Sequence, residues 1–227
     1  TYWFLVMRSD LNVKRGDANA VKGRRIGAAP MIDIGLIEML KEYGIDPKRD
    51  NVQIAPPPMP ANPAGVSFGV NAAKAMEEGK IDGYWANGMG AQVAVERGSG
   101  TMVLDARRGD GPASLRGYTF GVLATRADLV EKTPDKAAAA VRALVKAQKA
   151  LKADPNRATK IGEKWFPAFE ASLIAKLVER DLPYYDPTIS KKTFDDMCKF
   201  VQTVGLTKGV GNYEDVVTTQ FSDLWKA

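Results

Sequence analysis

Two segments of the chain, residues 2–10 and 118–128, share one pattern of apolar and polar positions. Each is an aromatic-rich apolar run that ends in an Arg, a small residue and an Asp. The pattern is typical of a buried strand. Two interpretations stay open: a pair of hinge strands, through which the chain leaves one lobe and returns beside its own exit, or two core strands of similar composition.

Between these segments, apolar strand-like runs alternate with helical periodicity. Strands are predicted at residues 24–29, 51–55, 81–86 and 101–104, and the helices between them end at Gly44, Gly79 and Gly98. Strand and helix alternation at this spacing favours parallel βαβ units with right-handed crossovers. We therefore expect an α/β fold in this part of the chain.

After residue 128 the periodicity is helical. Thr133 before Pro134 predicts a helix start with a capping hydroxyl, and further helices are expected at 155–165, 170–180, 190–204 with Ser190 as cap, and 213–225. These helices need a sheet to cover, and two hinge strands offer too little. We expect a first lobe that is incomplete at the N-terminus, with a division into 1–19 (hinge strand and linker), 20–117 (second lobe) and 118–227 (return strand and helices of the first lobe).

The loops that follow the predicted strands are the candidate ligand-binding segments. Ligands of open parallel sheets bind outside the carboxyl ends of the strands, where helix N-termini offer free N–H groups to an anion. Four segments meet this condition: 28–33, 55–59, 86–90 and 105–108. The candidate ligand-binding residues are Pro30, Met31, Ile32, Asp33, Pro57, Pro58, Trp85, Asn87, Gly88 and Met89.

Several of these positions also have a purely structural interpretation. Asp33 suits a helix N-cap better than an acceptor for a cationic ligand group, and Asn87 before Gly88 suits a tight turn as well as it suits a ligand contact. Trp85 could be core, because its neighbour Tyr84 points to the opposite side of the strand. Arg107 and Arg108 could pair with an anion, although adjacent arginines before a Gly-Asp-Gly sequence are more typical of a solvated loop.

Composition excludes several chemistries. The 227 residues contain no histidine, which rules out histidine-based acid/base catalysis and imidazole metal sites in this stretch, and one cysteine, Cys198, whose helical spacing predicts a buried position. The net charge of +5 is spread over amphipathic helices, so nucleic-acid binding is poorly supported. We expect no cofactor, no metal and no membrane-spanning helix, and any export signal to have been removed.

Four motifs then carry a resemblance. The chain resembles the periplasmic solute-binding proteins of ABC importers, in the branch for nitrate, sulfonate, taurine and thiamine precursors. The resemblance lies in the order and spacing of residues 21–27 (VKGRRIG), 77–83 (EEGKIDG), 124–134 and 185–190 (YDPTIS). The resemblance implies a periplasmic-binding-protein-like fold of two α/β lobes with hinge strands, a periplasmic location, and a ligand closed between the lobes. It also implies that the loops at 30–33 and 86–89 face the ligand.

The function expected from these observations is that of a non-enzymatic receptor. Its ligand would be a small organic anion or zwitterion of the sulfonate, nitrate or pyrimidine class, and its partner a membrane permease, with no nucleic acid bound and no direct membrane insertion. Two alternatives stay open, a pyrimidine-synthase-like enzyme on the same scaffold and the effector-sensing domain of a transcription regulator. Histidines upstream would favour the first, and an upstream helix-turn-helix the second.

Overall fold

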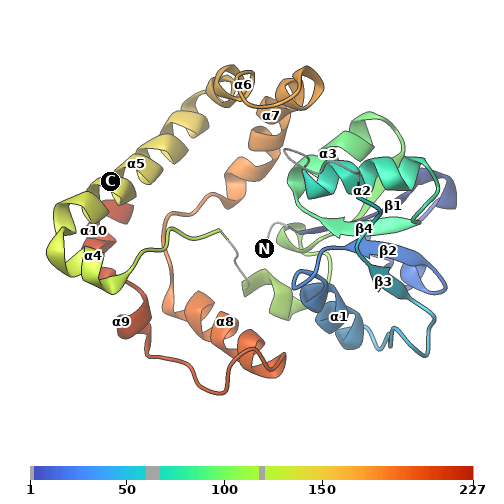
Figure 1. Cartoon of the computed structure of the whole chain (residues 1–227), viewed down its shortest axis with the longest axis horizontal. Coiled ribbons are helices and arrows are strands. Elements are labelled where there is room, and N and C mark those ends of the chain that lie inside the picture. The colour runs from blue at the N-terminus through green and yellow to red at the C-terminus, as the bar shows by residue number, and fades with distance from the viewer. Residues whose placement is uncertain (1–2, 60–66, 118–120, 227) are drawn as a thin grey trace. The chain divides into compact units, whose positions relative to one another are not determined.

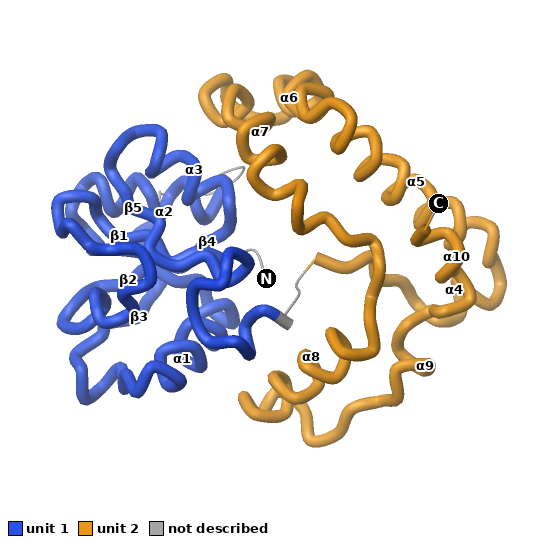
Figure 2. Tube along the Cα trace, turned by 180° about the vertical axis from the view of Figure 1, so that it is seen from behind, with its two compact units in different colours: residues 1–116 blue, residues 117–227 orange. Residues whose placement is uncertain are grey.

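The computed structural model describes residues 3–59, 67–117 and 121–226. The chain divides into two compact units, Thr1–Arg116 and Gly117–Ala227 (Figure 2). Unit 1 contains a sheet with helices on both faces, and the described part of unit 2 is helical (Figure 1). The predicted α/β class is confirmed in unit 1.

Unit 1 is built on a five-stranded mixed sheet. Its strands are β1 (Phe4–Arg8), β2 (Arg25–Ala28), β3 (Gln53–Ala55), β4 (Gly83–Ala86) and β5 (Gly100–Asp105), in the order β3-β2-β4-β1-β5. The β2–β3 and β2–β4 pairs are parallel, as the strand and helix alternation predicts. β1 runs antiparallel to both of its neighbours, β4 and β5.

Three helices cover the sheet: α1 (Asp33–Glu42), α2 (Phe68–Glu77) and α3 (Gly88–Glu96). α1 lies on one face, and α2 and α3 lie together on the other (Figure 1). Right-handed crossovers require this arrangement, because the chain moves from β2 outward to β3 and then back across to β4. The expected helix stops are confirmed, since Gly44, Gly79 and Gly98 all have positive φ.

The core of unit 1 lies on both sides of β1. Phe4, Leu5, Val6 and Met7 are all fully buried, as expected for an inner strand with helices on both faces. At the amino ends of β2 and β4, the Asp82 carboxylate accepts hydrogen bonds from the backbone N–H of Arg25 (2.9 Å) and from its guanidinium (Nε, 3.1 Å). This buried carboxylate joins the two strands at the edge opposite to the candidate site.

The two segments that share an apolar pattern, residues 2–10 and 118–128, fold differently from each other over their described parts. Residues 4–8 form the predicted strand, but residues 121–126 have no regular secondary structure, and a helix, α4 (Ala127–Lys132), starts directly after them. The expected strand at 118–128 is therefore wrong over its described part, because polar residues at 125–128 favour a helix start, with the Arg126 guanidinium paired to Asp128 (2.9 Å). Residues 118–120 lie outside the described residues, and the hinge role of both segments stays a prediction.

Unit 2 consists of helices. They are α4 (Ala127–Lys132), α5 (Pro134–Ala153), α6 (Asn156–Gly162), α7 (Ala168–Asp181), α8 (Lys191–Thr203), α9 (Tyr213–Val216) and α10 (Ser222–Trp225), with short 3₁₀ turns at Leu182–Tyr184 and Thr219–Phe221. Residues of α5 and α7, including Val145 and Leu173, are buried. No helix among the described residues combines the length and the apolar run needed to cross a bilayer.

Four expectations about unit 2 have clear outcomes. Ser190 is a helix cap as predicted, because its hydroxyl accepts from the Thr193 N–H at 3.0 Å. Thr133 is the N-cap residue of α5, but its hydroxyl does not cap the helix as expected: it donates backwards to the Leu129 carbonyl (2.9 Å). The single helix expected at 213–225 is broken, because Val217 is extended and two β-branched threonines follow it. Cys198 is only partly buried, since no residue of α8 is fully buried.

Candidate functional site

The carboxyl ends of four strands lie at one edge of the sheet in unit 1. The register pairs Ala28 with Trp85 and Gly27 with Ala55, so β2, β3 and β4 end together. Phe4, at the start of the antiparallel β1, faces Ala86 on one side and Asp105 on the other. The four strand-end segments selected from the sequence therefore come together, and this expectation is confirmed.

The segment that enters α1 has an unusual backbone. Met31 has a φ of 70° and a side chain that is 62% exposed. A side chain in the left-handed region costs conformational energy, and such residues concentrate where a protein binds ligands. The following N–H groups of Ile32 and Asp33 both donate to the Ala29 carbonyl, at 3.1 and 2.9 Å, which closes the turn around exposed Pro30 and Met31.

The cap of α1 differs from the prediction by one residue. Ile32 occupies the N-cap position, and Asp33 is the first helical residue. Its carboxylate accepts a hydrogen bond from the N–H of the next residue, Ile34, at 3.0 Å. A true N-cap side chain would accept from an N–H two or three residues further along the helix. The Asp33 side chain is half-buried in the first turn, where a negative charge is favoured by the helix dipole.

The first turn of α3 starts at Asn87. This residue is the N-cap of α3, but its side chain makes no capping hydrogen bond to the N–H groups of the first turn. Its Oδ1 atom is enclosed and has no hydrogen-bond partner among the described residues. Gly88 is buried behind it and Met89 is half-buried.

Two glycines bring the first turns of α2 and α3 into direct contact. A Cβ atom built on Gly90 would lie 2.5 Å from three backbone atoms of Gly69, and one built on Gly69 would lie 2.9 Å from Oδ1 of Asn87. No side chain other than hydrogen fits at either position. The N-termini of α2 and α3 are thereby held side by side at the candidate edge. Ser67, the expected cap of α2, is its N-cap residue but makes no side-chain cap.

The aromatic pair at the end of β4 is enclosed. Tyr84 is fully buried and its hydroxyl donates to the Gly90 carbonyl at 2.8 Å, which ties β4 to α3. Burial raises the pKa of Tyr84 well above its ordinary value. Trp85 is 3% exposed, so the structure places both rings inside unit 1 and Trp85 at the strand end beneath the edge.

The proline-rich segment after β3 is anchored to α2 by a residue that sequence reasoning missed. Asn71 is 8% exposed, and its amide donates to the Pro58 carbonyl at 2.9 Å and lies 3.2 Å from the Met59 sulfur. Pro57 is buried and Pro58 is exposed. A polar residue on an otherwise apolar helix face was the signal available in the sequence. Asn71 fixes where Pro57 and Pro58 lie.

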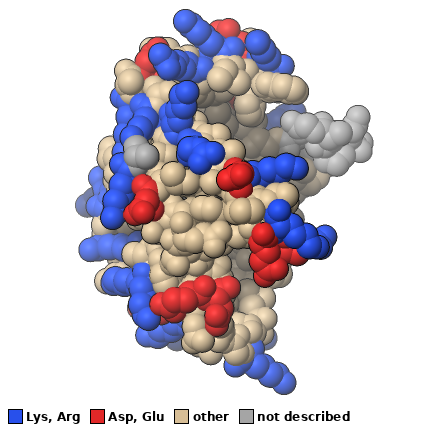
Figure 3. Space-filling view, turned by 90° about the vertical axis from the view of Figure 1, so that its left-hand side faces the viewer, with Lys and Arg blue, Asp and Glu red and all other residues tan. Residues whose placement is uncertain are grey.

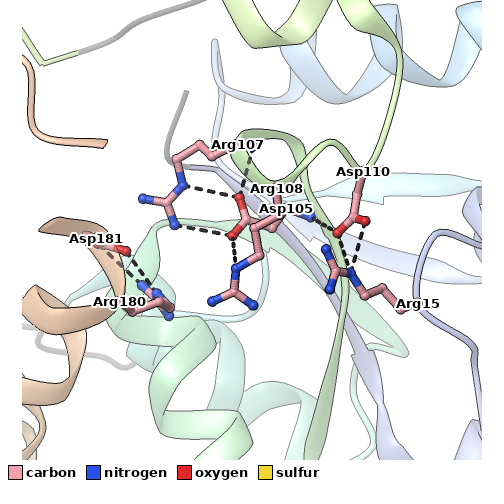
Figure 4. Close-up of polar contacts among 7 residues, drawn as sticks. All are labelled: Arg15, Asp105, Arg107, Arg108, Asp110, Arg180 and Asp181. Atoms are coloured by element: carbon pink, nitrogen blue, oxygen red, sulfur yellow. Dashed lines mark hydrogen bonds and ion pairs between the residues drawn. The ribbon is translucent and has the colours of Figure 1, made fainter. Parts of the chain in front are cut away.

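A cluster of charges lies where β5 ends (Figure 4). Asp105 is 1% exposed and accepts from the backbone N–H and from Nε of Arg107, both at 3.1 Å, while Nε of Arg108 lies 3.3 Å from its second oxygen. The Arg107 guanidinium also stacks 4.7 Å above the ring of Phe4. The expected solvated loop is wrong for Arg107, whose side chain is 8% exposed, and right for the exposed Arg108.

Two hollows lie elsewhere in the described residues. One of about 190 Å³ lies beside β2 and β3 and is bounded by Arg25, Lys80 and Pro58, so only Pro58 among the candidate residues lines it. The other, of about 260 Å³, lies in unit 2 between α8 and residues 210–214. Neither is formed by the entries of α1 and α3. The described residues contain no group of three or more Asp, Glu, His or Cys that could hold a metal ion.

The family of this fold is settled by comparison with known proteins. The model of the NMT1-like family matches residues 12–162, which is more than half of the chain. The chain belongs to the NMT1-like family. No curated protein sequence matches it significantly.

Solved structures of solute-binding proteins show the same fold as this NMT1-like chain. A periplasmic sulfonate-binding SsuA protein from Methylobacillus flagellatus KT is 18% identical with a TM-score of 0.61, over 99% of this chain and 65% of that one. The ligand-binding component of an ABC-type import system from Staphylococcus aureus, with zinc bound, is 16% identical with a TM-score of 0.66, over 98% and 70%. The Escherichia coli aliphatic sulphonate binding protein SsuA is 15% identical with a TM-score of 0.61, over 90% and 59%.

These likenesses confirm the periplasmic-binding-protein-like α/β fold. The NMT1-like chain spans 65% of the length of the Methylobacillus protein and 59% of the Escherichia coli protein. At 15–18% identity these proteins share the fold with the chain, and a shared fold does not specify the ligand.

Proposed function

We propose that this NMT1-like protein is the solute receptor of an ABC-type importer. It captures a small organic anion or zwitterion outside the cytoplasm and passes it to a membrane permease. Family membership and the fold shared with sulfonate-binding proteins support the receptor class. The identity of the ligand rests on the chemistry of the candidate edge.

The observation that carries the proposal is the convergence of strand ends and helix N-termini in unit 1. The entries of α1 and α3 follow two adjacent parallel strands, β2 and β4, so the positive ends of both helix dipoles lie at one edge. The N–H groups at the start of α1 are bonded within the chain, whereas the first turn of α3 has no side-chain cap. Uncapped N–H groups of this kind bind carboxylates, sulfonates and similar anions. The Asp105–Arg107–Arg108 cluster adds one net positive charge at the end of β5.

Other residues at the edge favour an organic ligand over a bare inorganic ion. Met31 and Pro58 expose apolar surface beside the polar groups, and Met89 is half-buried at the start of α3. The carboxylate of Asp33 lies half-buried in the first turn of α1. This acceptor suits a ligand that carries a donor as well as an acid group, as a zwitterion does.

The mechanism we propose is capture by population shift. The ligand binds better to the closed form of the receptor than to the open form, and the difference in affinity sets how far closure proceeds. The permease then recognises the closed form. No chemical step on the ligand is required.

Isothermal titration of the full-length protein tests this proposal with a panel of alkanesulfonates, nitrate, carboxylates, amino acids and pyrimidines. We expect saturable heat with one class, and mass spectrometry of the recovered ligand should show it chemically unchanged. Asn87→Ala should weaken that binding about tenfold, because a hydrogen bond to a charged group is lost. Asn19→Ala, an exposed asparagine in the 3₁₀ turn Ala18–Val21, is the matched control. Absence of heat with every compound, or turnover of the ligand, contradicts the receptor function.

A further inference from the structure

The charge cluster at the end of β5 holds one arginine by only part of its guanidinium. The carboxylate of Asp105, 1% exposed, accepts from the backbone N–H and from Nε of Arg107 at one oxygen, and Nε of Arg108 lies 3.3 Å from the other. The two terminal nitrogens of Arg108 point away from that carboxylate (Figure 4). They have no hydrogen-bond or ion-pair partner among the described residues, so their N–H donors are open to a further acceptor.

Exposure alone does not single out Arg108. Lys and Arg side chains are frequent on the surface of this protein, and many gather on the face that carries α5 (Figure 3). What sets Arg108 apart is a buried acidic anchor that already has a partner. The Arg107 side chain, 8% exposed, pairs with the same carboxylate through Nε and through a terminal nitrogen at 3.4 Å. One carboxylate cannot neutralise two guanidinium groups, so one positive charge remains within the cluster.

The carboxylate of Asp110 does not supply the missing charge. It accepts from Nε of Arg15 with both oxygens, at 2.9 and 3.0 Å, and from the backbone N–H of Asp105 at 3.0 Å. A guanidinium that is held through Nε presents its two terminal nitrogens as a planar fork, which matches two oxygens of a carboxylate or sulfonate group. Arg108 therefore has the geometry of a bidentate binder of acid groups.

The strand register places this cluster on the face of the sheet where α3 begins. Phe4 pairs with Ala86 on one side and with Asp105 on the other, so two strand spacings, about 10 Å, separate the ends of β4 and β5. Directly opposite residues point to the same face, which Asp105 therefore shares with Ala86. Tyr84 also points to that face, and its hydroxyl reaches the Gly90 carbonyl of α3 (2.8 Å). The cluster and the uncapped first turn of α3 thus lie on one side of the candidate edge.

We propose that Arg108 binds the acid group of the ligand through its two terminal nitrogens, while Asp105 holds its Nε. The inference rests on the proposed receptor function and names the residue that recognises the charge of the ligand. The uncapped N–H groups of α3 add a second set of donors from the neighbouring strand end.

Isothermal titration of the full-length protein tests this role with paired probes. Each alkanesulfonate, carboxylate and amino acid of the panel is compared with the uncharged sulfonamide or carboxamide of the same chain, and competition against the anion extends the measurement to a weakly bound amide. We expect Arg108→Gln to bind the anion about thirtyfold more weakly, because two hydrogen bonds to a charged group are lost. Arg108→Lys should lose about tenfold, because lysine restores the charge without the planar fork. The affinity for the amide should be the same in all three proteins.

The matched control is Arg49→Gln. Arg49 is exposed, pairs with Asp50 at 2.7 Å, and precedes β3 at the edge opposite to the candidate site. The control removes the same charge and should leave the affinities for both probes unchanged, and urea unfolding checks that each variant is folded.

Three results overturn the role of Arg108 while the receptor function stands. They are equal binding of the anion by Arg108→Gln and the wild type, an equal loss for the anion and its amide, and a ligand that carries no negative charge. An equal loss for both probes would indicate that Arg108 acts on the structure of the receptor and not on the acid group. Absence of binding by the wild type overturns the receptor function and this role together.

Discussion

The contact between Gly69 and Gly90 gives the sharpest test of how the candidate edge is held together. In Gly90→Ala the new methyl group would lie 2.5 Å from three backbone atoms of Gly69, so neither a rotamer change nor a flexible side chain can make room for it. The first turns of α2 and α3 must move apart. Overpacking of this kind costs about 3 kcal/mol when backbone has to shift.

The helix itself prefers alanine, and this preference works in the opposite direction. Gly→Ala inside a helix stabilises by about 0.5–1 kcal/mol. Gly90→Ala should therefore destabilise unit 1 by about 2 kcal/mol. Gly35→Ala is a matched control, because Gly35 is the third residue of α1 as Gly90 is of α3, and nothing lies within 4 Å of a Cβ built there. It should stabilise by about 0.5 kcal/mol.

Urea unfolding followed by circular dichroism measures both values, and ligand titration gives a second measurement on the same variants. Because Asn87 lies against Gly69, Gly90→Ala should also weaken ligand binding, whereas Gly35→Ala should leave it unchanged. If Gly90→Ala is as stable as Gly35→Ala, then α2 and α3 do not meet at these two glycines, and the close approach of their first turns is refuted.

Two carboxylates give the remaining predictions. Burial would raise the pKa of Asp82, but hydrogen bonds from Arg25 and the charges of Arg25 and Arg8 outweigh it and lower the pKa. Because the folded pKa lies below the unfolded value of about 3.9, this stabilisation is complete above about pH 5 and is lost as the pH falls through the folded pKa. Asp82→Asn should therefore cost about 2 kcal/mol at pH 7 and progressively less in acid, and a constant difference across a pH series of urea curves would contradict this. Asp105→Asn should cost about 3 kcal/mol, because it leaves the guanidinium of Arg107 buried beside a neutral partner. A loss below about 1 kcal/mol would instead indicate an exposed pair.

The sequence predicts local structure well where the signal is local. Short apolar runs between helix-ending glycines are sufficient to locate β2 to β5. The helices α1 to α3 also lie close to their expected positions, because capping and periodicity act within a few residues. The convergence of strand ends follows from these elements and the parallel pairing rule. Ser190 as a cap is predictable for the same reason.

What the sequence could not predict depends on partners far along the chain. The placement of β1 between β4 and β5, antiparallel to both, is set by tertiary pairing, and so is the burial of Arg107 over Phe4. The solvated-loop expectation for Arg107 considered only its neighbours in sequence. The strand expected after residue 120 resembles β1 in composition but gains no partner strand over residues 121–126.

The position of β1 also dictates how unit 1 can assemble. β1 has no partner strand until residues 83–86 and 100–105 exist, because both of its neighbours come late in unit 1. The β2–α1–β3 half can therefore form before β1 is paired. Pairing over such a sequence separation is slow, so we expect formation of the two β1 pairs to limit the folding rate of unit 1.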